Sequence, residues 1–181
     1  MRLLFVGINP STFSVQRGHY YARPTNRFWR AFSRSLLSAP LRRALGREEL
    51  SPEDDRALLE YGIGFTDVAK VPSRQASHLP RRAFAAWAPL LRDRIVSYEP
   101  AVVCFQGLTA WRWFARYALG NAGGPWSLGL QRIRVGRSRL FVVPSPSPAN
   151  ARVTLGELVS WYNRLARILP PGASSRGTRE R

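Results

Sequence analysis

The sequence has little of the chemistry from which metal and redox sites are built. Its 181 residues include one cysteine, Cys104, and two histidines, His19 and His78. A single thiol excludes an internal disulfide, a zinc site made from cysteines and an iron–sulfur cluster. The two histidines are far apart in the chain and the acidic residues are scattered. The sequence therefore predicts no metal site, and it gives no indication of a cofactor.

Long apolar runs are also missing. No stretch approaches the roughly 20 apolar residues that a membrane-spanning helix needs. The start, MRLLFVGINP, has too short an apolar run for a signal peptide and no small-residue cleavage site. Because Cys104 lies in the apolar segment AVVCF, we expect it to be an inert core thiol of a protein in the reducing cytoplasm.

Acidic residues are scarce, since 11 Asp and Glu stand against 28 Lys and Arg, and the net charge is +17. Such a charge favours a polyanionic partner, and a nucleic acid is one such partner. Lys70 is the only lysine, so 27 of the basic residues are arginine. The planar guanidinium group of arginine is well suited to phosphate.

The length fits one domain with a substantial core. We expect residues 1–169 to form that domain. Residues 170–181 are basic and poor in large apolar side chains, so we expect a disordered tail there. A single cleft over one ligand needs no symmetry, and we therefore expect a monomer.

Hydrophobic periodicity predicts alternating strands and helices. The expected strands are 2–8, 101–105, 130–135 and 139–143, with a short strand or turn near 65–69. The expected helices are 28–37, 52–61, 80–98, one from 108 through 114, and a last one from Arg152. This alternation is typical of an α/β fold, with a mainly parallel sheet covered by helices on both faces. Ligands of such sheets bind beyond the carboxyl ends of the strands, where Asn9, Asp67 and Gly107 are expected.

Five motifs in order resemble those of a known family. They are GINP at 7–10, YARPTNRFW at 21–29, GIGFTDVAKVPS at 62–73, VVCFQG at 102–107 and PSPSPANAR at 144–152. Together they resemble the mismatch-specific uracil-DNA glycosylases, the group of bacterial Mug and thymine-DNA glycosylase, from Leu3 to about Leu165. GINP alone is a weak signal, whereas several motifs in the right order are specific. The resemblance implies a three-layer uracil-DNA-glycosylase-like fold, with a four-stranded mainly parallel sheet, and excision of a damaged base from DNA.

Asn9, Thr66 and Asp67 are the candidate catalytic residues. The resemblance implies that Asn9 holds the attacking water and that Thr66 lies near it. The amide oxygen of Asn9 accepts a hydrogen bond but cannot take the proton as a carboxylate would. Asp67 could act as a base if it points into the cleft, and strand alternation allows this for only one of the two neighbours. The structural alternatives are an Asx-turn at Asn9 and a solvated Asp67 paired with an arginine.

Ile8, Tyr21 and Ser145 are the candidate substrate-binding residues. The resemblance places at Tyr21 the aromatic ring that stacks on the extruded pyrimidine, and a ring face can hold any flat base. Backbone groups of Ile8 and Tyr21 are expected to read the pyrimidine edge. Ordinary packing under a loop is the alternative for Tyr21. The role of Tyr20 is open, and His19 is expected to be exposed.

The run PSPSPAN departs from the family pattern. A large apolar wedge, which the resemblance implies there, is missing, because Ala149 and Asn150 stand in its place. Either residue would fill the space left by a flipped base less well. A proline-rich loop, a helix cap and a tight strand-to-helix turn are the structural alternatives. The candidate DNA contacts are Ser145, Ser147, Ala149, Asn150, Arg152 and, at the start of a helix, Gly107.

The predicted function is that of a monofunctional uracil-DNA glycosylase, which hydrolyses the N-glycosidic bond and leaves an abasic site. Glycosylases that also cut the strand usually form a Schiff base through a lysine, and only Lys70 is available. One alternative is a glycosylase of the same fold that prefers hypoxanthine or another purine lesion. Another is a non-catalytic nucleic-acid-binding module.

Overall fold

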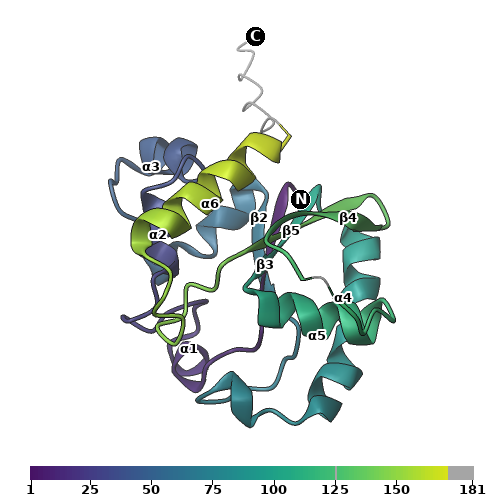
Figure 1. Cartoon of the computed structure of the whole chain (residues 1–181). Helices are drawn as coiled ribbons and strands as arrows, with labels where there is room; N and C mark the ends of the chain where they lie inside the picture. The colour runs from purple at the N-terminus through teal and green to yellow at the C-terminus, as the bar shows by residue number, and fades with distance from the viewer. Residues whose placement is uncertain (125, 171–181) are drawn as a thin grey trace.

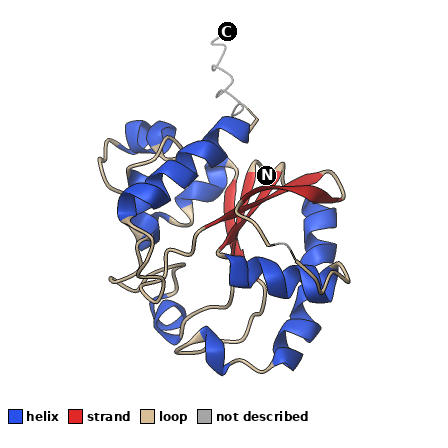
Figure 2. Ribbon diagram, in the orientation of Figure 1, coloured by secondary structure: helices blue, strands red, loops and turns tan. Residues whose placement is uncertain are grey.

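The computed structural model, which describes residues 1–124 and 126–170, has a sheet between two layers of helices (Figure 1, Figure 2). Its strands are Leu3–Gly7 (β1), Ile63–Asp67 (β2), Val102–Gln106 (β3), Gly129–Val135 (β4) and Ser138–Val143 (β5). They form one sheet in the order β2-β1-β3-β5-β4. All neighbours are parallel except β4, which is antiparallel to β5. The predicted α/β class with a mainly parallel sheet is confirmed.

The helices lie on both faces of this sheet, one group on each side in Figure 1. Their bounds are Thr12–Arg17 (α1), Phe28–Ser33 (α2), Ala39–Leu45 (α3), Arg81–Tyr98 (α4), Leu108–Ala118 (α5) and Leu155–Ile168 (α6). Helices α2 and α6 cover one face, and α4 and α5 cover the other. In the described part of the chain, no helix is both long and apolar enough to cross a membrane.

The sheet has five strands, one more than the four that the family resemblance implies. The extra strand is β4, which forms a hairpin with β5. Gly136 lies in the turn with a φ of 54°, a conformation that glycine adopts without strain. The alternation of apolar residues predicts both β4 and β5 as strands. The four strands implied by the resemblance are therefore corrected to five, and the sequence pattern already indicates the additional strand.

The helix expected over 52–61 is replaced by two 3-10 segments, Pro52–Asp54 and Ala57–Tyr61. The Asp54 carboxylate turns back and accepts from the backbone N–H of Ser51 at 2.9 Å. Ser51 and Asp54 thus form a capping box at the start of the first segment, which spans only three residues. The second ends at Gly62, whose φ of 71° terminates it as expected.

The last helix begins at Leu155 and not at Arg152, because Thr154 caps it. Oγ1 of Thr154 accepts from the N–H of Glu157 at 3.2 Å, and the Glu157 carboxylate accepts from the N–H of Thr154 at 2.6 Å. Arg152 therefore belongs to the preceding loop. The tail expected over 170–181 lies, from Pro171 on, outside the described residues.

The central strands send their side chains alternately into two cores. Phe5 of β1 lies in the core beneath α2 and α6, whereas Val6 lies in the core beneath α4 and α5. Cys104 and Phe105 of β3 divide in the same way. Both faces of the sheet are thus occupied by packing, and chemistry is left to the strand ends.

A cluster of aromatic rings joins the first core to the loop after α1. Phe28 is fully buried, and its ring centroid lies 5.1 Å from that of Phe5 and 5.5 Å from that of Phe32. Tyr21 stacks on it at 4.4 Å with an interplanar angle of 21°. Phe28 therefore supports both the central strand and a residue of the predicted site.

We expect Phe28→Ala to lower the free energy of unfolding by about 3–5 kcal/mol, because it removes a ring from a closed aromatic cluster. Urea denaturation would measure this loss. Leu59→Ala is the control, since Leu59 is 57% exposed and its substitution should change the value by less than about 0.5 kcal/mol. Equal effects of the two substitutions would contradict the packing role of Phe28.

Candidate active site

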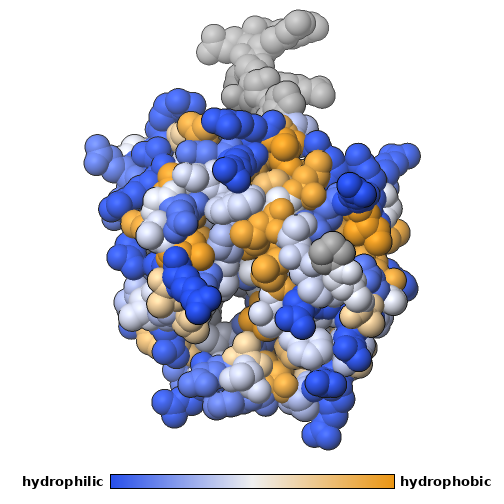
Figure 3. Space-filling model, viewed as in Figure 1, coloured by the Kyte–Doolittle hydropathy of each residue, from blue (hydrophilic) through white to orange (hydrophobic). Residues whose placement is uncertain are grey.

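A cleft of about 1350 Å³ lies beyond the carboxyl ends of the parallel strands. Strand β1 lies between β2 and β3, and the chain continues from β1 toward one layer of helices but from β3 toward the other. The loops after β1 and β3 therefore separate, and the crevice between such loops is the usual ligand site of parallel sheets. Figure 3 shows the surface hollowed in the lower half of the view, where these strand ends lie in Figure 1.

Asn9 follows β1, and three acceptors fix its side-chain nitrogen. Nδ2 donates to the carbonyl oxygens of Pro10 at 3.0 Å and Val71 at 3.1 Å, and to Oγ of Ser73 at 2.9 Å. These partners orient the amide, because its nitrogen alone can donate. Oδ1 receives no hydrogen bond from the described residues, and Asn9 lines the cleft. The amide oxygen is thus an oriented acceptor that can hold a water molecule.

Asp67, the last residue of β2, lies opposite Gly7 in the pairing of β1 with β2. Its carboxylate lies directly over that glycine, since a Cβ at position 7 would be 2.3 Å from Oδ1. Asp67 shares its strand face with Phe65, which packs against the core beneath α2 and α6. Alternation turns Thr66 to the opposite face.

The Asp67 carboxyl group is buried and weakly paired. Its side chain is 5% exposed, and Oδ2 accepts no hydrogen bond within residues 1–124 and 126–170. Nζ of Lys70 lies 3.8 Å from Oδ2. Burial raises the pKa of Asp67 to about 6, although Lys70 opposes the shift. Above that pH the cleft therefore contains a buried carboxylate that can accept a proton.

Lys70 connects Asp67 to the loop on the other wall of the cleft. Its Nζ donates to Oη of Tyr20 at 3.1 Å. The backbone of Tyr20 is itself anchored, because its N–H donates to Asp55 at 3.0 Å and its carbonyl accepts from Trp29 at 2.9 Å. His19 is half-buried and not exposed as expected, since its Nδ1 lies 3.1 Å from Oδ1 of Asp55.

Tyr21 adopts a conformation that is unusual for an aromatic residue. Its φ is 53°, in the left-handed region, where such strain is often associated with function. Phe28 covers one face of its ring. Burial, with a further effect of Asp67, raises the pKa of the Tyr21 hydroxyl well above its ordinary value. The group stays protonated and, among the described residues, Oη has no hydrogen-bond partner.

The loop from Pro144 to Val153, here termed the Ser-Pro loop, is held from within by Arg27. The guanidinium group donates to the carbonyls of Ser147 at 3.0 Å and Asn150 at 2.8 Å, and also to that of Val153. Nε and the backbone N–H of Arg27 both donate to the carbonyl of Pro146. Arg27 forms no ion pair with the described carboxylates. It is therefore committed to the shape of this loop.

Bonds within the Ser-Pro loop complete its shape. The side-chain amide of Asn150 donates to the carbonyl of Ser145 at 3.1 Å. Oγ of Ser147 accepts from the N–H of Ala149 at 3.3 Å, and Oγ of Ser145 accepts from the N–H of Ser147 at the same distance. Pro148 and Ala149 are exposed at its tip.

Gly107 allows the Ser-Pro loop to approach α5 closely. Its φ is 111°, and a Cβ there would lie 2.9 Å from Cβ of Ser145. Its own N–H donates to the carbonyl of Val143 at 2.9 Å and is not free for a phosphate. Leu108 and Thr109, the first residues of α5, line the cleft beside it. An anion at this helix terminus would meet their amides.

All but two of the predicted site residues line this cleft. Thr66 is buried on the other face of β2, and the exposed Arg152 lies outside the lining. The carbonyl of Ile8 accepts from the N–H of Ala69 at 3.1 Å and retains a second lone pair. The cleft brings together Ile8, Asn9, Tyr21, Asp67, Gly107, Ser145, Ser147, Ala149 and Asn150.

Residues 1–166 match the model of the uracil DNA glycosylase superfamily. The chain belongs to the uracil DNA glycosylase superfamily. Members of this superfamily are DNA glycosylases, hydrolases that act on DNA in base excision repair.

The contacts of three further residues, Arg27, Lys70 and Gln106, are seen only in the structure. Arg27 and Lys70 lie inside the matched motifs, but nothing in the sequence shows which backbone carbonyls or carboxylate they meet. Gln106 is buried at the end of β3, and its Oε1 accepts from Oη of Tyr162 at 2.9 Å. One signal was available for Lys70, since it is a lone lysine among arginines and stands three residues after Asp67.

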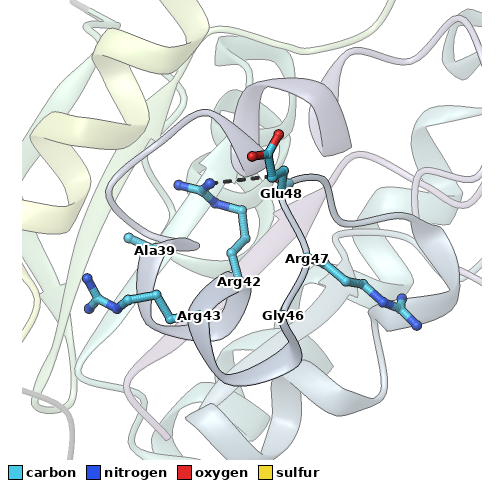
Figure 4. Close-up of a pocket in the computed structure, with 6 residues that line it drawn as sticks. All are labelled: Ala39, Arg42, Arg43, Gly46, Arg47 and Glu48. Atoms are coloured by element: carbon cyan, nitrogen blue, oxygen red, sulfur yellow. Dashed lines mark hydrogen bonds between the residues drawn. The ribbon is translucent and has the colours of Figure 1, made fainter.

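A second, smaller pocket lies beside α3. The arginine side chains that line it do not point toward a common centre. It is lined by Ala39, Arg42, Arg43, Gly46, Arg47 and Glu48. Figure 4 shows the side chains of Arg43 and Arg47 pointing away from one another. Within residues 1–124 and 126–170 no cluster of three or more His, Cys, Asp or Glu is placed to hold a metal ion.

We expect Arg27→Lys to loosen the Ser-Pro loop. A lysine carries its donors on one atom and cannot reach carbonyls that the planar guanidinium group spans. Hydrogen exchange of peptides covering 144–153, followed by mass spectrometry, should become faster by about tenfold or more, given about 1.5–3 kcal/mol for a charged hydrogen bond. Arg30→Lys, at an exposed position of α2, should leave the exchange unchanged. Unaltered exchange in Arg27→Lys would contradict the clamp.

We expect Asp67→Asn to stabilise this superfamily member at neutral pH. The pKa of Asp67 rises from 3.8 to about 6 on folding, so its stabilising contribution is complete below pH 3.8 and is lost as the pH rises through 6. The gain in unfolding free energy of the variant over the wild type should therefore grow by about 2–3 kcal/mol between pH 4 and pH 8. Denaturation of both proteins across this range would measure it. A difference that does not vary with pH would refute the assignment.

Proposed function

We propose that the protein is a monofunctional uracil-DNA glycosylase of the mismatch-specific group, which binds uracil flipped out of DNA and hydrolyses its N-glycosidic bond. The observation that carries this proposal is the oriented amide of Asn9. Its nitrogen is held by three acceptors, and its oxygen is left for a water molecule in the cleft. The match of residues 1–166 to the superfamily supports the reaction class.

In this mechanism Asn9 and Asp67 have different roles toward the attacking water. Asn9 holds the water through Oδ1 and directs it to the sugar carbon, while the ionised Asp67 takes the proton that the water loses. The pKa of Asp67 at about 6 supports this assignment, because the carboxylate is ionised at neutral pH and remains basic enough to accept a proton. The family resemblance places Thr66 near the water. Because its side chain is buried on the opposite face of β2, its effect on the water would be indirect.

Tyr21 provides the stacking surface for the extruded base in this proposal. Its ring is covered by Phe28 on one side, so the base would lie on the other face. Backbone groups of Ile8 and Tyr21 would read the pyrimidine edge, and Ser145 would contact the nucleotide. The phosphates would meet Ser147, Arg152 and the start of α5 after Gly107. Ala149 at the loop tip and the neighbouring Asn150 would lie beside the gap that the base leaves.

Lys70 supports the monofunctional assignment. Its nitrogen donates to Tyr20 and is paired with Asp67, and an amine held in this way is a poor nucleophile for an abasic sugar. The reaction would therefore end at the abasic site. The net charge of +17 fits a monomer that works on DNA in the cytoplasm, in association with the nucleoid.

A purine lesion such as hypoxanthine is the second candidate substrate. The cleft of about 1350 Å³ exceeds the roughly 300–1,000 Å³ of common small-molecule sites and leaves room for a larger base. The same assay decides between the two substrates, because the identity of the released base is read directly.

Single-turnover base release from duplexes with uracil, thymine or hypoxanthine opposite each normal base tests the proposal. We expect uracil release, and we expect Asn9→Ala and Asp67→Asn to lower its rate by about 10²- to 10⁴-fold with DNA affinity retained. Asn121→Ala, at an exposed loop asparagine outside the cleft lining, should match the wild type. Binding without release of any base would leave the nucleic-acid-binding module as the better description.

A further inference from the structure

The tip of the Ser-Pro loop is unusually small for a protein that would have to open a DNA duplex. Pulling a base out of a paired stack leaves a gap, and proteins that do so commonly insert a large apolar side chain into it. The exposed tip residues here are Pro148 and Ala149. The ring of Pro148 is compact, and Ala149 contributes one methyl group.

The loop is not free to rearrange and present a larger side chain. Arg27 binds four of its backbone carbonyls, at Pro146, Ser147, Asn150 and Val153. The amide of Asn150 is engaged with the carbonyl of Ser145 at 3.1 Å and so cannot reach into a base stack without breaking this bond. The shape seen in the structure is therefore the shape that meets DNA.

The other walls of the cleft do not supply the missing wedge. Among the exposed large apolar side chains of the described residues, Val15 alone lines the cleft. It is a short side chain on α1, the helix that follows Asn9. The long exposed side chains in the cleft lining are polar, namely Arg23, Arg74 and Gln75, and the exposed Arg152 lies outside this lining. They are suited to phosphates, which every DNA strand carries.

We infer that in this member of the group the small loop tip shifts the preference from a mismatched duplex to a damaged base in single-stranded DNA, where no partner base has to be displaced and no gap in a stack has to be filled. This inference rests on the proposed glycosylase function. An unpaired base spares the enzyme the few kcal/mol that opening a pair requires. The cationic rim still binds the backbone of the single strand, and Tyr21 offers the ring on which an unstacked base can lie.

Single-turnover rates on one uracil oligonucleotide, free or annealed so that uracil lies opposite adenine or guanine, test this inference. We expect release from the single strand to exceed release from the uracil–adenine duplex by about tenfold or more, with the weaker uracil–guanine pair between them. A duplex rate equal to or above the single-strand rate overturns the inference while leaving the proposed function intact. Absence of release from all three overturns both.

A binding measurement separates the two proposals further. Fluorescence anisotropy with an oligonucleotide carrying a tetrahydrofuran abasic analogue, single-stranded or duplex, needs no catalysis. We expect tighter binding of the single strand at matched salt, because the duplex retains a gap that the small loop tip does not fill. Tighter binding of the duplex would refute the inference whether or not any base is released.

The substitution Ala149→Leu tests the physical cause. A leucine at the tip supplies an apolar side chain of the kind that wedges between bases, so the ratio of duplex to single-strand rate should rise at least severalfold. Ala151→Leu is the matched control, since Ala151 is exposed in the same loop but outside the cleft lining, and its ratio should equal that of the wild type. An unchanged ratio in Ala149→Leu would show that the small tip does not set the preference.

Discussion

The structure depends on the position of β1 between β2 and β3, all three parallel. Its pairing on both sides brings Gly7 level with Asp67 and Val6 level with Phe105. The chain then leaves β1 and β3 toward opposite layers of helices, so a crevice opens at one fixed place. Asn9 is two residues beyond Gly7, the last paired position of β1, and is close enough to the sheet to be held firmly. Position in the fold, more than any single motif, thus determines where the chemistry lies.

Much of this architecture could be predicted from the sequence, because it follows from local patterns. Short apolar runs predicted β1 and β3, and alternation predicted β4 and β5. Helical spacing predicted α4, whose observed start at Arg81 is within one residue of the prediction. The segment 52–61 was predicted as one helix, and it starts with a capping box at Ser51 and Asp54. It nevertheless forms two 3-10 segments, and the apolar pattern does not distinguish these from one helix. The apolar pattern predicted the additional strand β4. The predicted count of four strands was wrong because it was taken from the family resemblance.

The candidate site was predictable as a set of residues but not as a set of contacts. The rule of strand alternation allowed one of Thr66 and Asp67 to face the cleft, and only three-dimensional packing shows that it is Asp67. Arg27 illustrates the other limit. Its partners are backbone carbonyls more than a hundred positions away, and a carbonyl has no signature in an amino-acid sequence. The chemistry of a side chain is known from the sequence, whereas the backbone carbonyls that it binds are known only from the three-dimensional structure.

The identity of residue 70 shows how the environment of Asp67 is tuned. The chain uses arginine for 27 of its 28 basic residues, yet the cation beside Asp67 is its single lysine. An arginine could bind both carboxylate oxygens with its planar fork, and such a pair would hold the carboxylate ionised and make it a weak base. Lysine at 3.8 Å leaves Oδ2 without a hydrogen bond. The carboxylate is therefore kept near a cation but not satisfied by it, which preserves its ability to accept a proton.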